Sequence, residues 1–450
     1  MPFVKRNALQ SIVGRMLSPF ENFIQQSTAG GITLIVSTVI ALALATWFGG
    51  EKFHHFWEQS LALRLSNIFE INLTWHAWIN DGLMALFFFV VGLELKREIL
   101  VGELASIKSA ALPVIAALGG MVVPATLYAA INVGTSEIAG WGIPMATDIA
   151  FAIGILILLG KRIPKNLIIF LTALAIADDL GAVLTIAIFY SQDINMNALK
   201  AAAGLFFLLM IFNRGGIRHP IPYIIIGILL WYAIFISGIH ATIAGVLLAM
   251  TIPARPTFTT TQFEKRITAL FEEFRAEKRA NAMHSPLCND RIAAIAASVE
   301  KTADAVQTPL QKMEHSLTPW VTFLIIPIFA LSNAGIDLKV IEWGNIFADK
   351  VTIGVMLGLV VGKFIGISLF SWIAVKARIG RLPSNVQWSH LMGAAWLGGI
   401  GFTMSLFIGQ LAFSSSIAIE QAKLGILLAS LVSAIIGVAW LITFTKPLKT

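Results

Sequence analysis

The chain has 450 residues, of which 57% are apolar and 13% are charged, with a formal net charge of +7. Soluble domains carry about 25% charged residues, so this composition indicates a polytopic membrane protein and argues against a soluble one. The positive charge also raises the question of nucleic-acid binding. Most of the 32 Lys and Arg residues, however, fall in loops on one side of the predicted topology. The charge therefore indicates membrane orientation and not a nucleic-acid partner.

Apolar windows predict an all-α polytopic membrane protein with twelve transmembrane helices. Residues 1–253 would hold the first eight and residues 318–450 the last four, within one integral membrane domain. The excess of Lys and Arg in alternate loops places both termini in the cytoplasm, and few basic residues, Lys423 among them, are assigned to the outer side. The predicted spans are 29–48, 77–93, 108–131, 138–160, 166–190, 197–213, 221–237, 239–253, 318–335, 351–375, 386–413 and 421–445.

Two segments interrupt this series of spans. Residues 49–76 are mixed in polarity, lie on the predicted outer side and are compatible with a short β or interfacial element. Residues 254–317 place Phe263, Ile267 and Leu270 at helical spacing among charged residues. This pattern predicts a cytoplasmic amphipathic helical excursion. A solvated linker without chemistry is its simplest interpretation.

The fifth predicted span carries two adjacent carboxylates, Asp178 and Asp179, near its midpoint. A carboxylate at that depth costs at least about 2.5 kcal/mol, and neighbouring carboxylates also repel each other. Adjacent side chains on a helix diverge by about 100°, so the two carboxylates cannot both face one partner helix. Both could line a water-filled cavity. Carboxylate oxygens that bind a cation in one state and protons in another provide what cation/proton exchange requires.

Three further ionisable residues lie within predicted spans: Asp81, Asp148 and Lys363. Such residues are functional candidates by default. For Lys363, a structural ion pair with one carboxylate is the alternative. One lysine cannot neutralise two aspartates, so this alternative does not account for the pair in the fifth span.

The fourth and eleventh spans are predicted to be broken. Gly142 and Pro144 precede Thr147 and Asp148, and a glycine-rich stretch, 398–401, precedes Thr403. Proline removes a backbone donor and glycine weakens a helix, and unwound backbone at membrane depth is tolerated only beside protein or a cavity. Half-helix ends carry partial charges, so we expect Asp148 to balance the first break and Lys363 the second. Close glycine packing is the alternative.

Charged residues also gather at the predicted inner boundary. They are Glu94, Lys96, Arg97 and Glu98 in one string, and Glu314 and His315 in another. Snorkelling and orientation explain Lys96 and Arg97 without a further role. A histidine beside acids is nevertheless the residue type that changes charge near neutral pH. His240 is isolated and is interpreted as a packing residue.

Seven strings, in order along the chain, resemble the NhaA-type sodium/proton antiporter family: WINDGLMALFFFVVGLELKRE, ATDIAFAIG, LTALAIADDLGAV, SGIHATIAGV, IPIFALSNAG, GKFIGISLF and GIGFTMSLFI. The family is a known example of inverted repeats and discontinuous helices. The resemblance implies repeats formed by spans three to five and ten to twelve, with broken helices that cross at spans four and eleven. It also implies a cytoplasmic funnel that leads to the membrane midplane.

The resemblance also implies roles for individual residues. Asp178 and Asp179 would bind the ion and protons, with Thr147 and Asp148 at the crossing of the broken helices and Lys363 as the partner of Asp178. Asp81 is expected on the ion pathway. The expected cytoplasmic pH-sensing cluster consists of Glu94, Arg97, Glu98, Glu314 and His315. One departure is Thr318, at a position where the family member best known for pH control has a second histidine.

The resulting hypothesis is an electrogenic, pH-regulated exchanger of the bacterial inner membrane that exports Na⁺ or Li⁺ in return for two protons. It needs no enzyme chemistry, no cofactor and no tightly bound metal, and a homodimer in membrane lipid is expected from the family. The alternative is a sodium-coupled symporter of an organic solute, which would need a polar and aromatic pocket near the midplane. An intramembrane aspartyl protease would need its two aspartates on separate helices.

Overall fold

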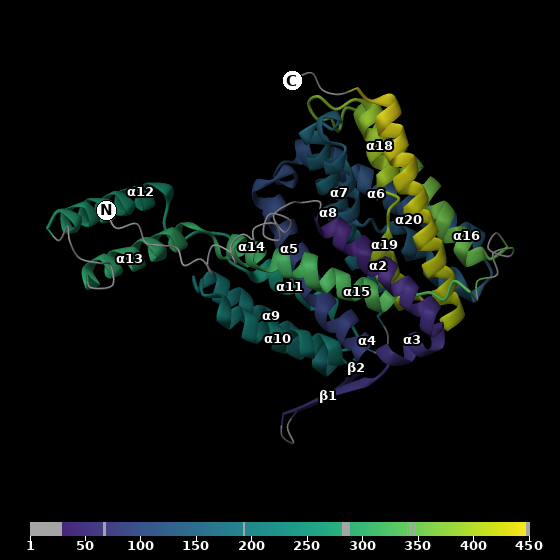
Figure 1. Ribbon diagram of the computed structural model, residues 1–450, viewed down its shortest axis with the longest axis horizontal. Helices are drawn as coiled ribbons and strands as arrows, with labels where there is room; N and C mark the ends of the chain where they lie inside the picture. Colours follow the sequence, from purple (N-terminus) through teal and green to yellow (C-terminus); the bar gives the residue numbers. More distant parts are fainter. Residues whose placement is uncertain are drawn as a thin grey trace, which may run out of the picture.

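The computed structural model describes residues 29–65, 69–191, 194–280, 289–339, 341, 344 and 348–446. Most of these residues are helical, and the helices form one bundle from which a hairpin of two helices projects (Figure 1). Both chain termini, whose location was predicted, lie outside the described residues.

Among the residues that the structure describes, eight helices are long and apolar enough to cross a membrane, or nine if one bent pair counts as a single span. They establish a helical multi-pass membrane protein. The first half contains α2 (Ala29–Phe48), α3 (Gly50–Trp57), α4 (Trp75–Ala77), η2 (Trp78–Leu83), α5 (Met84–Val101), η3 (Glu103–Ala105), α6 (Ile107–Ile131), η4 (Ser136–Met145), α7 (Ile149–Leu158), η5 (Gly160–Arg162), α8 (Lys165–Phe189), α9 (Met196–Arg214), α10 (Pro220–Ile236) and α11 (Thr242–Thr251).

The second half begins with the projecting hairpin and returns to the bundle. Its helices are α12 (Thr260–Ala280), α13 (Asp290–Val306), α14 (Pro309–Trp320), η7 (Val321–Ile325), α15 (Ile326–Asn333), α16 (Lys350–Leu357), η8 (Gly358–Gly362), α17 (Lys363–Lys376), α18 (Trp388–Leu397), α19 (Phe402–Ala412) and α20 (Ser416–Phe444). The helix that begins at Pro309 runs through a π-helical segment, η7, into α15. Glu314 and His315 therefore belong to a spanning helix.

A two-stranded antiparallel hairpin departs from the predicted all-α fold. Strand β1 (Ser60–Leu65) pairs with β2 (Phe69–Thr74), with Ser60 opposite Thr74. The hairpin lies within the segment where the sequence left a short β element open, and it extends from one end of the bundle (Figure 1).

The last span begins earlier than predicted. Helix α20 starts at Ser416 and not at residue 421, because the polar residues of its first turns are helical too. Lys423 is therefore not an outer-loop residue: it lies inside α20 and only 3% of its surface is exposed. The side of the membrane toward which this end of α20 lies stays a prediction.

Helices α6 and α17 pack closely against each other beside the site. A Cβ atom on Gly119 of α6 would collide with the backbone carbonyl of Gly366 on α17, and the reverse is also true. Paired glycines let helix backbones approach closely in a membrane. This contact fixes α17, and with it Lys363, against α6.

Candidate functional site

The two adjacent aspartates of α8 lie in the interior of the bundle. Asp178 and Asp179 are each 1% exposed. They are flanked along α8 by buried alanine and leucine side chains, so their carboxylates meet protein and not solvent. Charge buried this deeply requires compensation from neighbouring elements.

Lys363, at the start of α17, and Thr147, in the break of the fourth span, supply that compensation for Asp178. The Lys363 ammonium donates to Asp178 Oδ2 at 2.5 Å and to Thr147 Oγ1 at 2.9 Å. Thr147 Oγ1 is also 2.9 Å from Asp178 Oδ2 and 2.9 Å from the carbonyl oxygen of Gly398. Its single proton can serve only one of these two acceptors at a time. The contacts of Asp178 with Lys363 and Thr147 are thus both made by Oδ2.

Asp179 has no such partner. Both of its carboxylate oxygens, and Oδ1 of Asp178, are buried and lack a hydrogen-bond partner among the described residues. Its electrostatic neighbours include Asp178, Asp148 and Lys363. A carboxylate left this way is stable only if it is protonated or holds a cation. Carboxylate oxygens are the ligands that hard cations such as Na⁺ prefer, and they can also be protonated.

Both carboxylate oxygens of Asp148 accept hydrogen bonds, and the donors belong to two helices. Its Oδ1 accepts from the backbone N–H of Phe151 at 3.1 Å, in the first turn of α7. Its Oδ2 accepts from Thr403 at the start of α19, from the backbone N–H at 3.1 Å and from Oγ1 at 2.6 Å. The positive N-terminal ends of both half-helices therefore meet one carboxylate. Lys363, expected to balance the second break, donates instead to Asp178 and Thr147.

The unwound segments of the two broken helices lie against each other. The backbone N–H of Asp148 donates to the carbonyl oxygen of Ile400 at 2.6 Å, and Ser405 Oγ donates to the carbonyl oxygen of Ile143 at 2.8 Å. Helices α18 and α19 meet at a bend of 45°. A Cβ atom on Gly399 would lie 2.5 Å from the carbonyl oxygen of Leu359, so this position accepts only glycine. Backbone groups released by one break are satisfied by the other.

Asp81 lies apart from this cluster, in the π-helical segment η2. Its backbone carbonyl accepts from Trp231 Nε1 at 2.8 Å. In the part of the chain that the structure describes, no hydrogen bond or ion pair joins its carboxylate to Asp178 or Asp179. The structure therefore does not bring this predicted residue into the site.

The predicted inner acidic cluster assembles between α5 and α14. Arg97 Nε lies 3.1 Å from Glu314 Oε1, and an Arg97 terminal nitrogen lies 3.7 Å from Glu98 Oε1. Glu94 interacts electrostatically with Glu314 and also with Asp179, so it connects the cluster with the buried pair. His315 is exposed beside Glu314.

Two neighbours of this cluster have purely structural bonds. Lys96 donates to the carbonyl oxygens of Met250 and Ile252 at 2.6 and 2.5 Å, which caps the end of α11. Thr318 Oγ1 donates to the carbonyl oxygen of Glu314 at 2.7 Å, within its own helix. Elsewhere, His240 Nε2 lies 3.0 Å from the carbonyl oxygen of Tyr190, as suits a packing histidine.

A second polar network, toward the end that carries the β hairpin, was not anticipated. Asn333 Nδ2 donates to Asn80 Oδ1 at 3.1 Å, and Asn333 Oδ1 lies 3.1 Å from His76 Nε2. Lys423 acts electrostatically on His76 and on His54. Burial, Lys423 and His76 together lower the pKa of His54 to about 4, so His54 is neutral near pH 7 and does not sense pH there.

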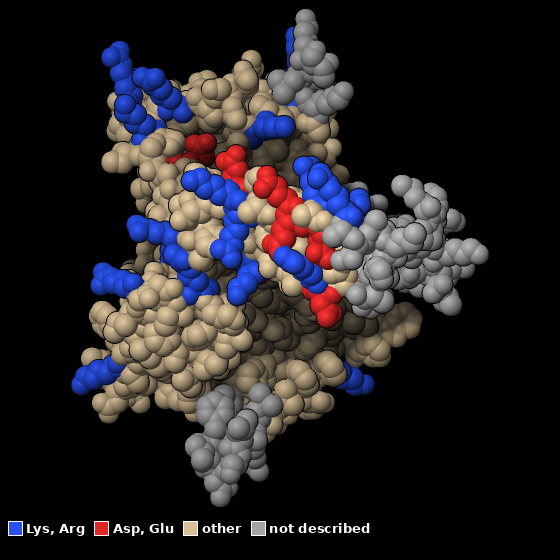
Figure 2. All heavy atoms as spheres, turned by 90° about the vertical axis from the view of Figure 1, so that its left-hand side faces the viewer, with Lys and Arg blue, Asp and Glu red and all other residues tan. Residues whose placement is uncertain are grey.

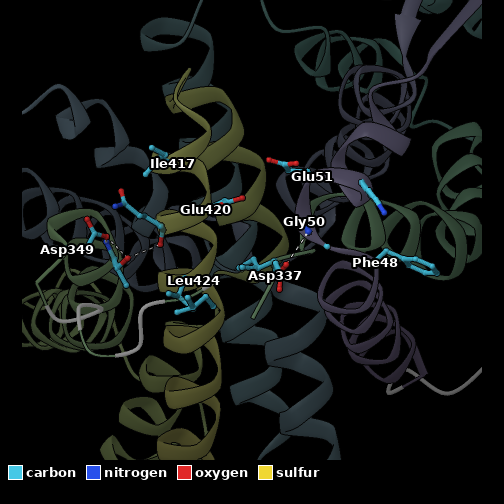
Figure 3. Close-up of a pocket in the computed structure, with 14 residues that line it drawn as sticks. Phe48, Gly50, Glu51, Asp337, Asp349, Ile417, Glu420 and Leu424 are labelled. Carbon is cyan, nitrogen blue, oxygen red and sulfur yellow. Dashed lines mark hydrogen bonds between the residues drawn. The ribbon is translucent and has the colours of Figure 1, made fainter. Parts of the chain in front are cut away.

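A cavity of about 690 Å³ is lined by residues from the starts of α3, α16 and α20 (Figure 3). Glu51, Asp337, Asp349 and Glu420 contribute its carboxylates, and Asp337 accepts from the backbone N–H of Gly50 at 3.3 Å. None of the predicted site residues lines it. The volume of a cavity therefore does not mark the candidate site, whereas the unpartnered carboxylate oxygens do.

Comparison with known proteins is consistent with this geometry. The family model described as Na⁺/H⁺ antiporter 1 matches residues 21–441. A protein named Na⁺/H⁺ antiporter NhaA from Syntrophobacter fumaroxidans is 59% identical, over 96% of this chain and 92% of its own length. Its namesake from Acidithiobacillus ferrooxidans is 56% identical, over 96% and 98%. Na⁺/H⁺ antiporter NhaA 1 from Saccharophagus degradans is 49% identical, over 95% and 92%.

Proposed function

This chain belongs to the Na⁺/H⁺ antiporter 1 family, and we propose that Asp178 and Asp179 are the groups on which it exchanges Na⁺ or Li⁺ for protons. The observation that carries the proposal is the set of three buried carboxylate oxygens without a partner among the described residues. The ion pair of Lys363 with Asp178 does not account for Asp179, whose two oxygens stay without a described partner. A site that is alternately filled by a cation and by protons requires such oxygens.

The contacts support a stoichiometry of two protons per sodium ion. In the proton-loaded site, Asp179 is protonated and the Lys363 ammonium pairs with Asp178, so the net charge is zero. An arriving Na⁺ takes oxygens of both aspartates; Asp179 releases one proton, and Lys363, deprived of its partner, releases the second. The sodium-loaded site then carries one negative charge. Transport is electrogenic for this reason, and the proton gradient drives sodium export.

Thr147 and the paired breaks position this chemistry. Thr147 Oγ1 contacts Lys363, Asp178 and Gly398, one group from each of three elements. Asp148 neutralises the two positive half-helix ends beside the pair, so those ends do not repel the ion or the protons. Alternating access would then move these helices as a unit, exposing the pair first to one side and then to the other.

The architecture that we propose around the site has twelve spans, with α7 and α19 as halves of two crossing broken helices in inverted repeats. Asp81 would lie on the ion pathway. The face from which the α12–α13 hairpin projects carries many Lys and Arg side chains around a band of acidic residues (Figure 2). This distribution supports a cytoplasmic location for that face and for the segment 254–317. A bacterial inner membrane and a homodimer complete the proposal.

The cluster of Glu94, Arg97, Glu98, Glu314 and His315 is proposed to make transport pH-dependent. The ion pair between Arg97 and Glu314 joins α5 to α14, and Glu94 acts electrostatically on Asp179. A change in protonation there would alter both the packing of α5 on α14 and the field at the buried pair.

The test is proton movement in everted vesicles that hold a pH gradient, followed with a pH-sensitive dye. Na⁺ or Li⁺ should collapse the gradient, K⁺ should serve as the selectivity control, and Asp179→Asn should give no response. A sodium-coupled symporter would instead need an organic solute and would leave the gradient intact. No response to Na⁺ in the wild type would overturn the proposal.

A further inference from the structure

A polar cavity of about 370 Å³ lies where the N-terminal ends of α6 and α8 meet the segment before α18. Lys108 of α6 and Arg381 of that segment both line it. Neither of these cations forms an ion pair with a residue that the structure describes, although Glu103 lines the same cavity. The two cations outnumber the one carboxylate of the lining, so the charge of the cavity favours an anion.

The other side of the cavity is apolar. Ile169 of α8 lines it and is 43% exposed, and Phe170 and Leu112 form its buried wall. In a membrane protein, an exposed isoleucine on a spanning helix faces acyl chains. A small soluble anion would leave this wall uncovered, whereas a phospholipid would place its phosphate on the cations and a chain along the wall.

The lining also belongs to the elements that carry the ion site. Asn166 of α8 donates to the carbonyl oxygen of Ser384 at 2.8 Å, which ties α8 to the segment before α18. Ser106 caps α6, which packs closely on α17. A molecule in the cavity would therefore hold together the ends of the helices that bear Asp178, Asp179 and, through α6, Lys363.

We infer that an anionic phospholipid binds in this cavity, with its phosphate on Lys108 and Arg381 and an acyl chain against Ile169, and that it clamps these helix ends. The inference does not depend on which ions the protein transports. Each cation near an anionic membrane surface contributes about 1 kcal/mol, so removing both should weaken binding about 30-fold.

The test uses the full-length protein, purified and delipidated in neutral detergent, with thermal unfolding and native mass spectrometry as readouts. Phosphatidylglycerol should raise the unfolding temperature, whereas phosphatidylcholine and inorganic phosphate should not. Lys108→Gln/Arg381→Gln should lose most of this shift and bind phosphatidylglycerol about 30-fold more weakly. Both side chains are exposed, so the lipid-free double variant should unfold at the wild-type temperature.

The matched control is Lys278→Gln/Arg279→Gln, which removes the same two charge types from exposed positions on α12. It should bind the lipid as the wild type does. Equal loss in both double variants would show diffuse attraction to charge and would overturn the inference. An equal shift with inorganic phosphate would also overturn it, because the cavity would then hold a free anion. Ile169→Ser should weaken lipid binding without conferring a response to phosphate.

Discussion

Two carboxylates of this protein, Asp148 and Asp179, are almost equally buried, yet their surroundings are opposite. Asp148 accepts three hydrogen bonds from the first turns of two half-helices. Asp179 accepts none from any described residue. Burial of charge alone therefore does not identify an exchange site. A satisfied carboxylate holds the two breaks together, and an unsatisfied one is available to a cation or a proton.

The largest expected effect is that of Asp179→Asn on transport. We expect exchange to fall at least about 100-fold, because an amide can neither release a proton nor neutralise Na⁺. The unfolding temperature should stay equal to or above that of the wild type, since no partner of Asp179 is lost. Dye-based exchange assays and thermal unfolding check the two halves of this prediction. A markedly unstable Asp179→Asn protein would mean that the carboxylate is structural.

Lys363→Met should destabilise the protein by about 3–5 kcal/mol, because it leaves Asp178 charged and buried without its partner. The double variant Lys363→Met/Asp178→Asn should recover most of that loss, since it removes the uncompensated charge. Thermal unfolding of Lys363→Met, Asp178→Asn and the double variant measures the coupling energy between the two residues. Additive losses would show that the 2.5 Å ion pair does not govern stability here.

Asp148→Ala should cost about 2–4 kcal/mol in stability, because three buried donors of Phe151 and Thr403 lose their acceptor. Asp148→Asn should cost less, as its remaining carbonyl oxygen still accepts. Thr403→Val removes one hydroxyl and should cost about 1 kcal/mol. If Asp148→Ala were as stable as the wild type but inactive, Asp148 would resemble Asp179, and the contrast between them would fail.

The smallest expected effect is at Thr147. Thr147→Ser keeps the hydroxyl and should transport normally. Thr147→Val should raise the Na⁺ concentration for half-maximal exchange about 10-fold, which corresponds to the loss of one charge-assisted hydrogen bond of about 1.4 kcal/mol. Titration of exchange with Na⁺ separates the two variants. Equal behaviour of both would show that the hydroxyl does not orient Asp178.

Much of the helical organisation could be predicted from hydropathy, because long apolar runs leave little choice of structure. The limits of α2 and α8 agree with the prediction to within a residue. Helix ends that carry charge were not predicted. α5 continues to Val101 because Lys96 caps α11 and Arg97 pairs with Glu314, and a hydropathy window contains no information on such partners.

The pairing of Lys363 with an aspartate could be anticipated, because few other ionisable residues lie within the predicted spans. The contacts of Asp148 could not be anticipated. That carboxylate binds Thr403, which is far away in sequence, and only the packing of two breaks brings them together. The Asn80–Asn333 bond was missed for the same reason. Neutral amides within apolar strings give no charge signal, although both lie in strings that resemble the family.

The central claim is that Na⁺ and protons compete for the oxygens of Asp179 and Asp178. The most direct measurement is proton release from purified protein in weakly buffered detergent solution when Na⁺ is added, with K⁺ as the ionic-strength control. The account predicts proton release by the wild type, approaching two protons for each Na⁺ bound, and none by Asp179→Asn. Sodium binding without proton release, or unchanged release by Asp179→Asn, would contradict it.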